Sequence, residues 1–244
     1  MMQDLERRIA ALFGAGVAVA VTDTAAPNPP LLPVEAVAMA RAVPQRVAEF
    51  TAGRAAARLA MQRLGLPPLA VPAAPDRSPV WPAGLTGSIS HAGGICAAVL
   101  TRDLSRRIGL DIEDPAPLEP DLWPLVLTPA ELTALNTLPP ADRGIVAKRV
   151  FGIKEAAYKA QFTLTGAVIG FQALEVLPLP GLAGQVPGGF GDDSVNSPLE
   201  AATAQVRATD IGTMVPGLQK LFPKQGRRCQ IAGPAQNTRN MLIA

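Results

Sequence analysis

The chain has 244 residues, 48% of them hydrophobic and 17% charged, and its formal net charge is +2. This length is enough for one or two domains with a substantial core, and the hydrophobic fraction excludes a disordered chain. The small net charge and the aromatic content of 4% argue against a nucleic-acid-binding surface. The two cysteines, Cys96 and Cys229, exclude a disulfide framework and favour a reducing compartment, so we expect a cytoplasmic protein.

Histidine occurs once, at His91, which excludes multi-histidine zinc sites and two-histidine iron sites built by this chain alone. Any bound metal would therefore be held mainly by carboxylates. Carboxylate oxygens favour hard divalent cations, so the composition points to Mg²⁺, with Mn²⁺ as the alternative.

The first predicted elements are a helix and a buried strand. The early apolar run over residues 9–21 is too short to span a bilayer, and we expect no membrane partner. Acidic residues before this run argue against a secretory leader peptide. The pattern favours a helix that ends at Phe13, a glycine-containing turn over 14–16 and a strand over 17–22.

A long helix is predicted over residues 43–65, because this segment is rich in Ala, Leu, Arg and Gln and ends in glycine, with a proline just beyond. Residues 66–86 are rich in proline and predict a loop. Two apolar runs, 95–101 and 108–112, flank a polar turn and together predict a β-hairpin.

A proline-containing break then marks a seam, so we expect one domain over residues 1–115 and a second over 116–180. In the second domain, Thr128 opens a capping box with proline at the first helical position, which predicts a helix start. A further helix is predicted over about 145–161 and a strand over 171–177.

Residues 181–244 form a third region with nine glycines, five prolines and little periodicity apart from a short helix expected near Leu218. Such a segment buries little apolar surface against an ordering cost of about 1–2 kcal/mol per residue. We expect it to be poorly ordered and to contribute no catalytic residue. The alternative is a hairpin beside the predicted 171–177 strand.

Asp111 and Glu113 lie two residues apart in a predicted strand, so their carboxylates share one face. Like charges this close repel each other unless a cation lies between them. A hard divalent ion, with phosphate oxygens completing its shell, suits this pair. Considered alone, however, the pair is best explained as an ordinary polar face at the end of a strand.

Glu155 and Lys159 lie four residues apart on a predicted helix and share a face with Phe151 and Tyr158. Considered alone, the pair is best explained as a routine helix-stabilising ion pair worth about 0.3–0.5 kcal/mol. The alternative is a charged pair that lines a cleft, because the same face carries two aromatic rings.

Arg46, Arg54 and Arg58 fall on one arc of the predicted long helix, among apolar residues. Bidentate guanidinium–phosphate contacts and arginines that cover core residues explain this arc equally well. Considered alone, the segment 87–91, Gly-Ser-Ile-Ser-His, is best explained as a loop in which His91 is a hydrogen-bonded turn residue. The alternative is that the backbone of this loop approaches a ligand and that His91 donates to a phosphate.

Four segments, taken in order, resemble the 4′-phosphopantetheinyl transferases of the surfactin-type superfamily, in the branch that includes the enterobactin synthetase component. They are RVAEFTAGRAAAR (46–58), RSPVWPAGLTGSISH (77–91), IGLDIE (108–113) and FGIKEAAYKA (151–160). Their order and spacing carry the resemblance, which spans about residues 12–177.

The resemblance implies an α/β fold of the α+β kind, with two similar halves in a pseudo-twofold relation and coenzyme A in the cleft between them. It implies transfer of the phosphopantetheine arm to a serine of an apo acyl or peptidyl carrier protein, with release of 3′,5′-adenosine bisphosphate. Coenzyme A is then the co-substrate, Mg²⁺ the cofactor and the carrier protein the partner of a monomeric enzyme.

The resemblance also implies a role for each candidate residue. Asp111, Glu113 and Glu155 would hold Mg²⁺ against the pyrophosphate, and Glu155 would also be the general base. Lys159 would stabilise the departing phosphate, with help from Lys154. The contacts to coenzyme A would come from Arg46, Arg54, Arg58, Arg77, Ser90, His91, Asp111, Lys154 and Lys159.

Two other functions stay open at this point. One is a catalytically impaired relative that only binds coenzyme A or the carrier protein. The other is a different enzyme acting on coenzyme A, such as an acyltransferase, for which the sequence shows neither a nucleophile motif nor a His–Asp base pair. The sequence does not name the carrier protein or its pathway.

Overall fold

The computed structural model describes residues 2–177, 203–208, 231–232 and 242–243. The helices of the first half are α1 (Met2–Phe13), α2 (Pro33–Ala36) and α3 (Pro44–Arg63), with the 3-10 turn η1 (Val37–Met39) after α2. Its strands are β1 (Val17–Asp23), β2 (Thr86–Ala92), β3 (Ile95–Thr101) and β4 (Ile112–Glu113). The predictions for α1, β1, α3 and the proline-rich loop are confirmed, with α3 within two residues of its expected ends.

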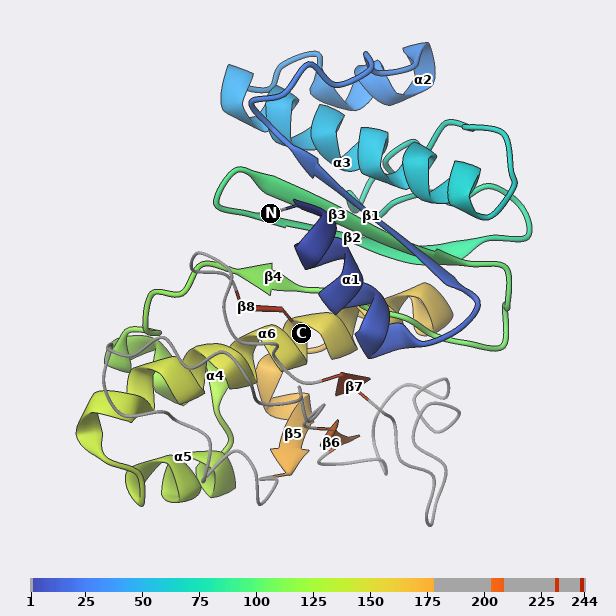
Figure 1. Cartoon of the computed structure of the whole chain (residues 1–244). Helices are drawn as coiled ribbons and strands as arrows, with labels where there is room; N and C mark the ends of the chain where they lie inside the picture. The colour runs from blue at the N-terminus through green and yellow to red at the C-terminus, as the bar shows by residue number, and fades with distance from the viewer. Residues whose placement is uncertain (1, 178–202, 209–230, 233–241, 244) are drawn as a thin grey trace.

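An antiparallel sheet in the order β1-β3-β2 forms the centre of the first half, with α3 on one face and α1 on the other (Figure 1). Successive side chains of β1 point to opposite faces of the sheet, as they do in any β-strand. Ala18 and Ala20 pack with α3, whereas Val19 and Val21 pack with α1. The small alanines on the α3 side meet a helix that is itself rich in alanine, which lets the helix lie close to the sheet.

The predicted hairpin of 95–101 with 108–112 is wrong. β3 pairs instead with β2, and the two strands are joined by Gly93 and Gly94, both with positive φ. A Gly-Gly pair between two strands is a two-residue hairpin turn, which explains this pairing. The segment 87–91, predicted as a loop, is therefore a strand.

The second half contains η2 (Pro120–Leu122), α4 (Trp123–Val126), α5 (Pro129–Asn136), α6 (Pro140–Thr165), η3 (Phe171–Ala173) and β5 (Leu174–Leu177). The capping box predicted at Thr128 is confirmed, since its hydroxyl accepts from the Glu131 amide and Glu131 accepts from the Thr128 amide. The helix predicted over 145–161 extends from Pro140 to Thr165 and ends at Gly166, which has a left-handed conformation.

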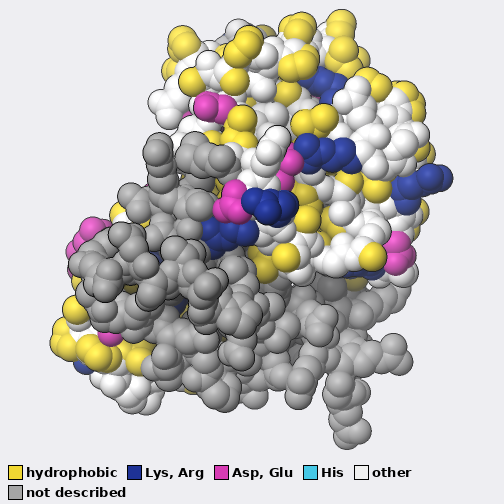
Figure 2. All heavy atoms as spheres, viewed as in Figure 1, with side chains coloured by type: hydrophobic (Ala, Val, Ile, Leu, Met, Phe, Trp, Pro, Cys, Tyr) yellow, Lys and Arg dark blue, Asp and Glu magenta, His cyan; other side chains and the backbone are white. Residues whose placement is uncertain are grey.

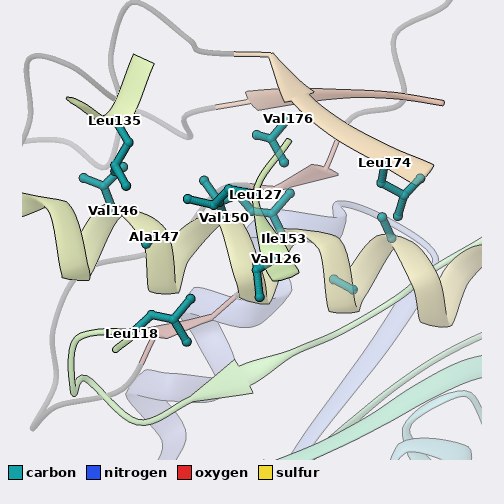
Figure 3. Packing of buried hydrophobic residues seen from close by; sticks show 12 residues of the cluster. Leu118, Val126, Leu127, Leu135, Val146, Ala147, Val150, Ile153, Leu174 and Val176 are labelled. Atoms are coloured by element: carbon teal, nitrogen blue, oxygen red, sulfur yellow. The ribbon is translucent and has the colours of Figure 1, made fainter. Parts of the chain in front are cut away.

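A cluster of buried hydrophobic side chains holds the second half together (Figure 3). Leu174 and Val176 of β5 lie over α6, where they meet Val150 and Ile153. Leu118 packs into the same cluster from the other side of α6. This packing fixes α6 between the short strands of the second half and the sheet of the first.

Gly109 is the point where the first half comes closest to α6. A Cβ atom here would collide with the Ala156 carbonyl oxygen and would lie 3.0 Å from the Ala160 nitrogen. Only glycine permits this approach, which carries Asp111 to the side of α6.

The described residues of the 181–244 region are three strands: β6 (Thr203–Ala208), β7 (Ile231–Ala232) and β8 (Leu242–Ile243). β6 pairs antiparallel with β5, and β8 pairs with β4. The poor order expected for most of this region stays a prediction, while β6 takes the alternative position beside β5. The helix expected near Leu218 lies outside the described residues. Within the described parts of the chain, no helix combines the length and the apolar character needed to cross a bilayer.

Candidate functional site

Side chains from β2, the start of β4 and α6 meet at Asp111. The Lys159 ammonium donates to Asp111 Oδ1 at 2.6 Å and also contacts Ser90 Oγ and the Leu110 carbonyl, both at 3.2 Å. Ser90 donates to the same Asp111 oxygen at 3.0 Å. Asp111 is only 4% exposed, whereas the Lys159 side chain is 28% exposed, so the ammonium lies at the edge of the cluster towards solvent.

The predicted helix-stabilising pair is thus replaced by a contact between the halves. Lys159 pairs with Asp111, 48 residues away in sequence, and the described ion pairs of Lys159 do not include Glu155. Phe151 and Tyr158, predicted on the same face, stack on different rings, Phe171 and Phe162. Lys159 therefore links α6 to the first half.

Glu113 lies beside Asp111 and accepts from Lys148 at 3.2 Å. Burial raises the pKa of Glu113, and the neighbouring Asp111 charge raises it further, although Lys148 opposes both effects. The second oxygen of Asp111, Oδ2, is buried and has no hydrogen-bond partner. A buried unpartnered oxygen beside a second carboxylate fits a hard divalent cation.

The predicted metal-binding trio is not assembled. No three Asp, Glu, His or Cys side chains of the described ranges lie close enough together to hold a metal ion. Asp111 and Glu113 form the pair, and the Asp111 charge also acts on Glu155. A metal ion held here would take two carboxylates from this pair, with water or phosphate oxygens as its other ligands.

Glu155 is half-buried on α6. Burial raises the pKa of Glu155, the Lys159 charge lowers it and the Asp111 charge raises it, with a net shift upward. A carboxylate with a raised pKa is a better proton acceptor than an exposed glutamate, as a general base requires. Glu155 and Tyr158 also line a small cavity of about 130 Å³ with Phe171.

Lys154 does not take the predicted catalytic position. Its side chain is 0% exposed and donates to the Val126 carbonyl and Glu131 Oε2, both at 2.7 Å, and to the Phe171 carbonyl at 3.2 Å. An ammonium has three protons, and these contacts use all of them. Burial lowers the pKa of Lys154, while Glu131 opposes the shift. Lys154 is thus a core residue of the second half.

A cavity of about 700 Å³ opens beside α3, within the usual size of a small-molecule site. Three arginines line it: Arg41 from the turn before α3, Arg46 from the first turns of α3, and Arg77 from the proline-rich loop. Arg46 and Arg77 were predicted to bind a ligand, whereas Arg41 was missed. Arg41 precedes the predicted helix, and no periodic pattern connects it with the other two.

Exposed hydrophobic side chains also line this cavity. Val34 and Val37, which line it, are 56% and 75% exposed. Figure 2 shows hydrophobic side chains gathered over the end of the molecule that carries α2 in Figure 1. Cations inside an apolar rim suit a ligand with an anionic group and a hydrophobic or aromatic body.

Arg54 and Arg58 are not among the residues that line this cavity, and their ligand contacts stay a prediction. Arg54 is 5% exposed, donates to the Val71 carbonyl at 2.6 Å and lies over the Phe50 ring. Arg58 is 7% exposed and pairs with Glu35 at 2.6 Å. Of the three arginines predicted on one arc of α3, Arg46 lines the cavity, whereas Arg54 and Arg58 are buried. Burial lowers the pKa of Arg54 to about 10, partly opposed by Glu35.

Strand β2 connects the cavity with the Asp111 cluster. Ser90 and His91 are neighbours on the strand, so their side chains point to opposite faces. Ser90 contacts Asp111, whereas Arg46 Nη1 lies 2.9 Å from His91 Nε2. Burial lowers the pKa of His91, so at neutral pH its ring is uncharged and its Nε2 accepts from Arg46.

Both halves match models of known families. Residues 34–101 match the 4′-phosphopantetheinyl transferase N-terminal domain, and residues 107–203 match the 4′-phosphopantetheinyl transferase superfamily. The phosphopantetheinyl transferase Svp of Streptomyces mobaraensis is 37% identical over 175 residues, which are 69% of this chain and 70% of Svp. The chain belongs to the 4′-phosphopantetheinyl transferase superfamily.

Other members of this superfamily are similar over shorter stretches. The phosphopantetheinyl transferase PptT of Mycobacterium tuberculosis is 38% identical over 146 residues, covering 58% of this chain and 62% of PptT. Enterobactin synthase component D of Escherichia coli K12 is 36% identical over 140 residues, covering 54% of this chain and 62% of that protein. The chain thus spans slightly less than two thirds of these two relatives.

Proposed function

We propose that this protein transfers the phosphopantetheine arm of coenzyme A to a serine of an apo acyl or peptidyl carrier protein and releases 3′,5′-adenosine bisphosphate. The observation that carries the proposal is the Asp111–Lys159–Ser90 cluster, because it joins the two halves beside a cavity lined by three arginines. The similarity to three proteins named as phosphopantetheinyl transferases, at 35–38% identity, supports it.

The arginine cavity binds coenzyme A. Arg41, Arg46 and Arg77 offer guanidinium groups to the 3′-phosphate, for which bidentate contacts are favourable. His91 lies within hydrogen-bond distance of Arg46, so it can contact the same phosphate when that arginine turns towards the ligand. Ser90, whose hydroxyl contacts Asp111 and Lys159, instead orients the neighbouring charged cluster.

Asp111 and Glu113 would hold Mg²⁺, or Mn²⁺ as the alternative hard cation. Such an ion would neutralise charge on the pyrophosphate during phosphoryl transfer. Asp111 keeps one oxygen free of protein partners, which is the donor that this role requires.

Glu155 takes the proton of the carrier serine, consistent with its raised pKa. The serine oxygen then forms a bond to the phosphorus that carries the pantetheine, and the bond from that phosphorus to the departing adenosine bisphosphate breaks. Lys159, partly exposed beside Asp111, stabilises the negative charge that develops on the leaving phosphate. A monomeric state and a cytoplasmic location complete the proposal.

Mass spectrometry of apo carrier proteins after incubation with coenzyme A and Mg²⁺ tests the proposal. The expected result is a carrier that gains the mass of one phosphopantetheine, with one 3′,5′-adenosine bisphosphate released per transfer. Omission of the metal should stop the transfer. Binding of coenzyme A without release of the bisphosphate, across several carrier types, would instead indicate a binding-only relative.

A further inference from the structure

Glu35 is a fully buried carboxylate at the joint between α2, α3 and the loop that follows α3. Its Oε2 accepts from the Leu32 amide at 2.9 Å and from Arg58 at 2.6 Å. Its Oε1 accepts from the Val71 amide at 2.9 Å. One side chain therefore connects three segments that are distant in sequence, and both of its oxygens are used.

The two buried arginines of α3 complete this joint. Arg58 also donates to the carbonyls of Pro29 and Pro30, at 3.3 and 3.1 Å. Arg54 donates to the Val71 carbonyl, so both backbone polar groups of Val71 are held. The chain on either side of the cavity is thus attached to α3 through buried charged contacts rather than through apolar packing alone.

Two walls of the arginine cavity lie outside α3, and each follows one of these attachments along the chain. Arg41 lies on the wall that starts at α2, six residues after Glu35. Arg77 lies on the opposite wall, six residues after Val71. Arg46 belongs to α3 itself, so it needs no such support. Glu35 contacts both wall-bearing segments and α3 through one carboxylate.

We propose that Glu35, acting with Arg58, is a positioning residue that sets the separation of Arg41 and Arg77 and so determines the preference for a 3′-phosphorylated ligand. This inference rests on the proposed function, because the ligand is taken to be coenzyme A. It assigns to Glu35 and Arg58 an indirect effect on binding and no contact with the substrate.

The decisive variant is Glu35→Gln. A glutamine carbonyl cannot accept from both the Leu32 side and the Val71 side, and its amide group meets the Val71 amide as a second donor. The other half supplies the matched control, Glu131→Gln. Glu131 is also buried, also accepts from an amide three residues before it, and also pairs with a cation of a long helix, but it lies outside the arginine cavity.

Calorimetric titration and steady-state kinetics with coenzyme A and 3′-dephospho-coenzyme A provide the readout. Glu35→Gln should weaken coenzyme A at least tenfold, in both Kd and KM, and shrink its advantage over the dephospho ligand, with kcat at saturation within about threefold. Glu131→Gln should lower the melting temperature comparably and leave the ratio of the two affinities unchanged. Equal ratios in the two variants would overturn the proposal.

Arg58→Lys gives a second, milder variant if Glu35→Gln does not fold. Lysine keeps the charge and the contact to Glu35 but lacks the planar guanidinium group that also donates to the Pro29 and Pro30 carbonyls. An intermediate loss of the preference for coenzyme A over 3′-dephospho-coenzyme A is therefore expected. Hydrogen exchange of peptides covering residues 66–80 should accelerate in either variant while peptides of α6 keep their protection. Unchanged exchange in 66–80 would contradict the proposal, whereas a wild-type protein that binds no coenzyme A would contradict the proposed function instead.

Discussion

Each half of the molecule contains a buried glutamate that lies three residues after the start of a helix-capping turn, Glu35 in the first half and Glu131 in the second. Each glutamate pairs with a cation 23 residues later in the sequence, Arg58 and Lys154 respectively. The carboxylate oxygens of Glu35 and Glu131 accept corresponding hydrogen bonds. Oε2 accepts from the cation and from the amide three residues earlier, and Oε1 accepts from an amide beyond the long helix. The cation of each half also binds a carbonyl five residues before the glutamate, in Pro30 or Val126.

The surroundings of the two networks differ. The first lies behind the arginine cavity, whereas the second lies beneath the part of α6 that carries Glu155 and Lys159. The same buried arrangement thus underlies the arginine-lined cavity in one half and the residues of the proposed catalytic cluster in the other. A charged residue beside a catalytic one in sequence can therefore belong to the core, because successive helix positions point in different directions.

The largest effect should come from the catalytic side of this comparison. Glu155→Gln keeps the shape of the side chain but removes the charge and the base, so transfer should fall by about 10²–10⁴. Affinity for coenzyme A, set by the other half, should change by less than about threefold. Single-turnover kinetics and calorimetry on the same preparation separate the two quantities. A fall in affinity as large as the fall in rate would make Glu155 a binding residue only.

Lys154→Met tests whether the second network is structural. It leaves the Glu131 carboxylate buried without its cation, which should cost about 3–5 kcal/mol of unfolding free energy. Urea denaturation measures this loss. The folded fraction should keep a transfer rate within about fivefold of wild type, whereas Lys159→Met should lose far more activity than stability. A stable Lys154→Met protein without activity would restore the catalytic role predicted from the sequence.

Substitutions at Arg77 and Arg54 distinguish the role of the cavity from that of the buried network behind it. Arg77→Ala should weaken coenzyme A by about 10–100-fold, since hydrogen bonds between charged groups contribute about 1.5–3 kcal/mol. The affinity for 3′-dephospho-coenzyme A should change little. Arg54→Ala should mainly lower the melting temperature and affect the two ligands alike. A selective loss of coenzyme A in Arg54→Ala alone would reverse this assignment.

The smallest expected effect is the pH dependence at His91. Burial holds its pKa below the usual 6.5, so the neutral ring accepts from Arg46 in the free protein. A bound 3′-phosphate favours the protonated ring, so coenzyme A should bind a few-fold more tightly as the pH falls below about 6.5, with uptake of a proton. Calorimetry in two buffers of different ionisation enthalpy measures this uptake, which His91→Gln should abolish.

The same group affects stability with a defined sign. Because the folded-state pKa of His91 is lowered, the unfolded chain binds the proton more readily. Its contribution to stability is therefore present above about pH 6.5 and is lost as the pH falls through the folded-state pKa. His91→Gln should remove this part of the acid dependence in denaturation experiments.

Local signals predicted most of the long elements. The alanine-rich run gave α3 to within two residues, and the capping box gave the start of α5 at Thr128. The hairpin prediction is wrong because the apolar run at 108–112 has a stronger strand pattern than the serine-containing segment 86–92, which is the partner of β3 in the structure. The Gly93–Gly94 turn was the signal that would have identified the correct partner.

The motifs by themselves determined the family and predicted the kinds of groups at its site: a carboxylate pair, a lysine beside it and arginines for a phosphate. These features are residue identities at short spacing, which the sequence displays directly. Only the tertiary structure decided which charged groups remain accessible. Arg58 and Lys154 form buried ion pairs with glutamates that lie 23 residues earlier in the sequence. Lys159 pairs with Asp111, which lies 48 residues away. Burial depends on segments that are distant along the chain, and no local pattern specifies which of them will meet.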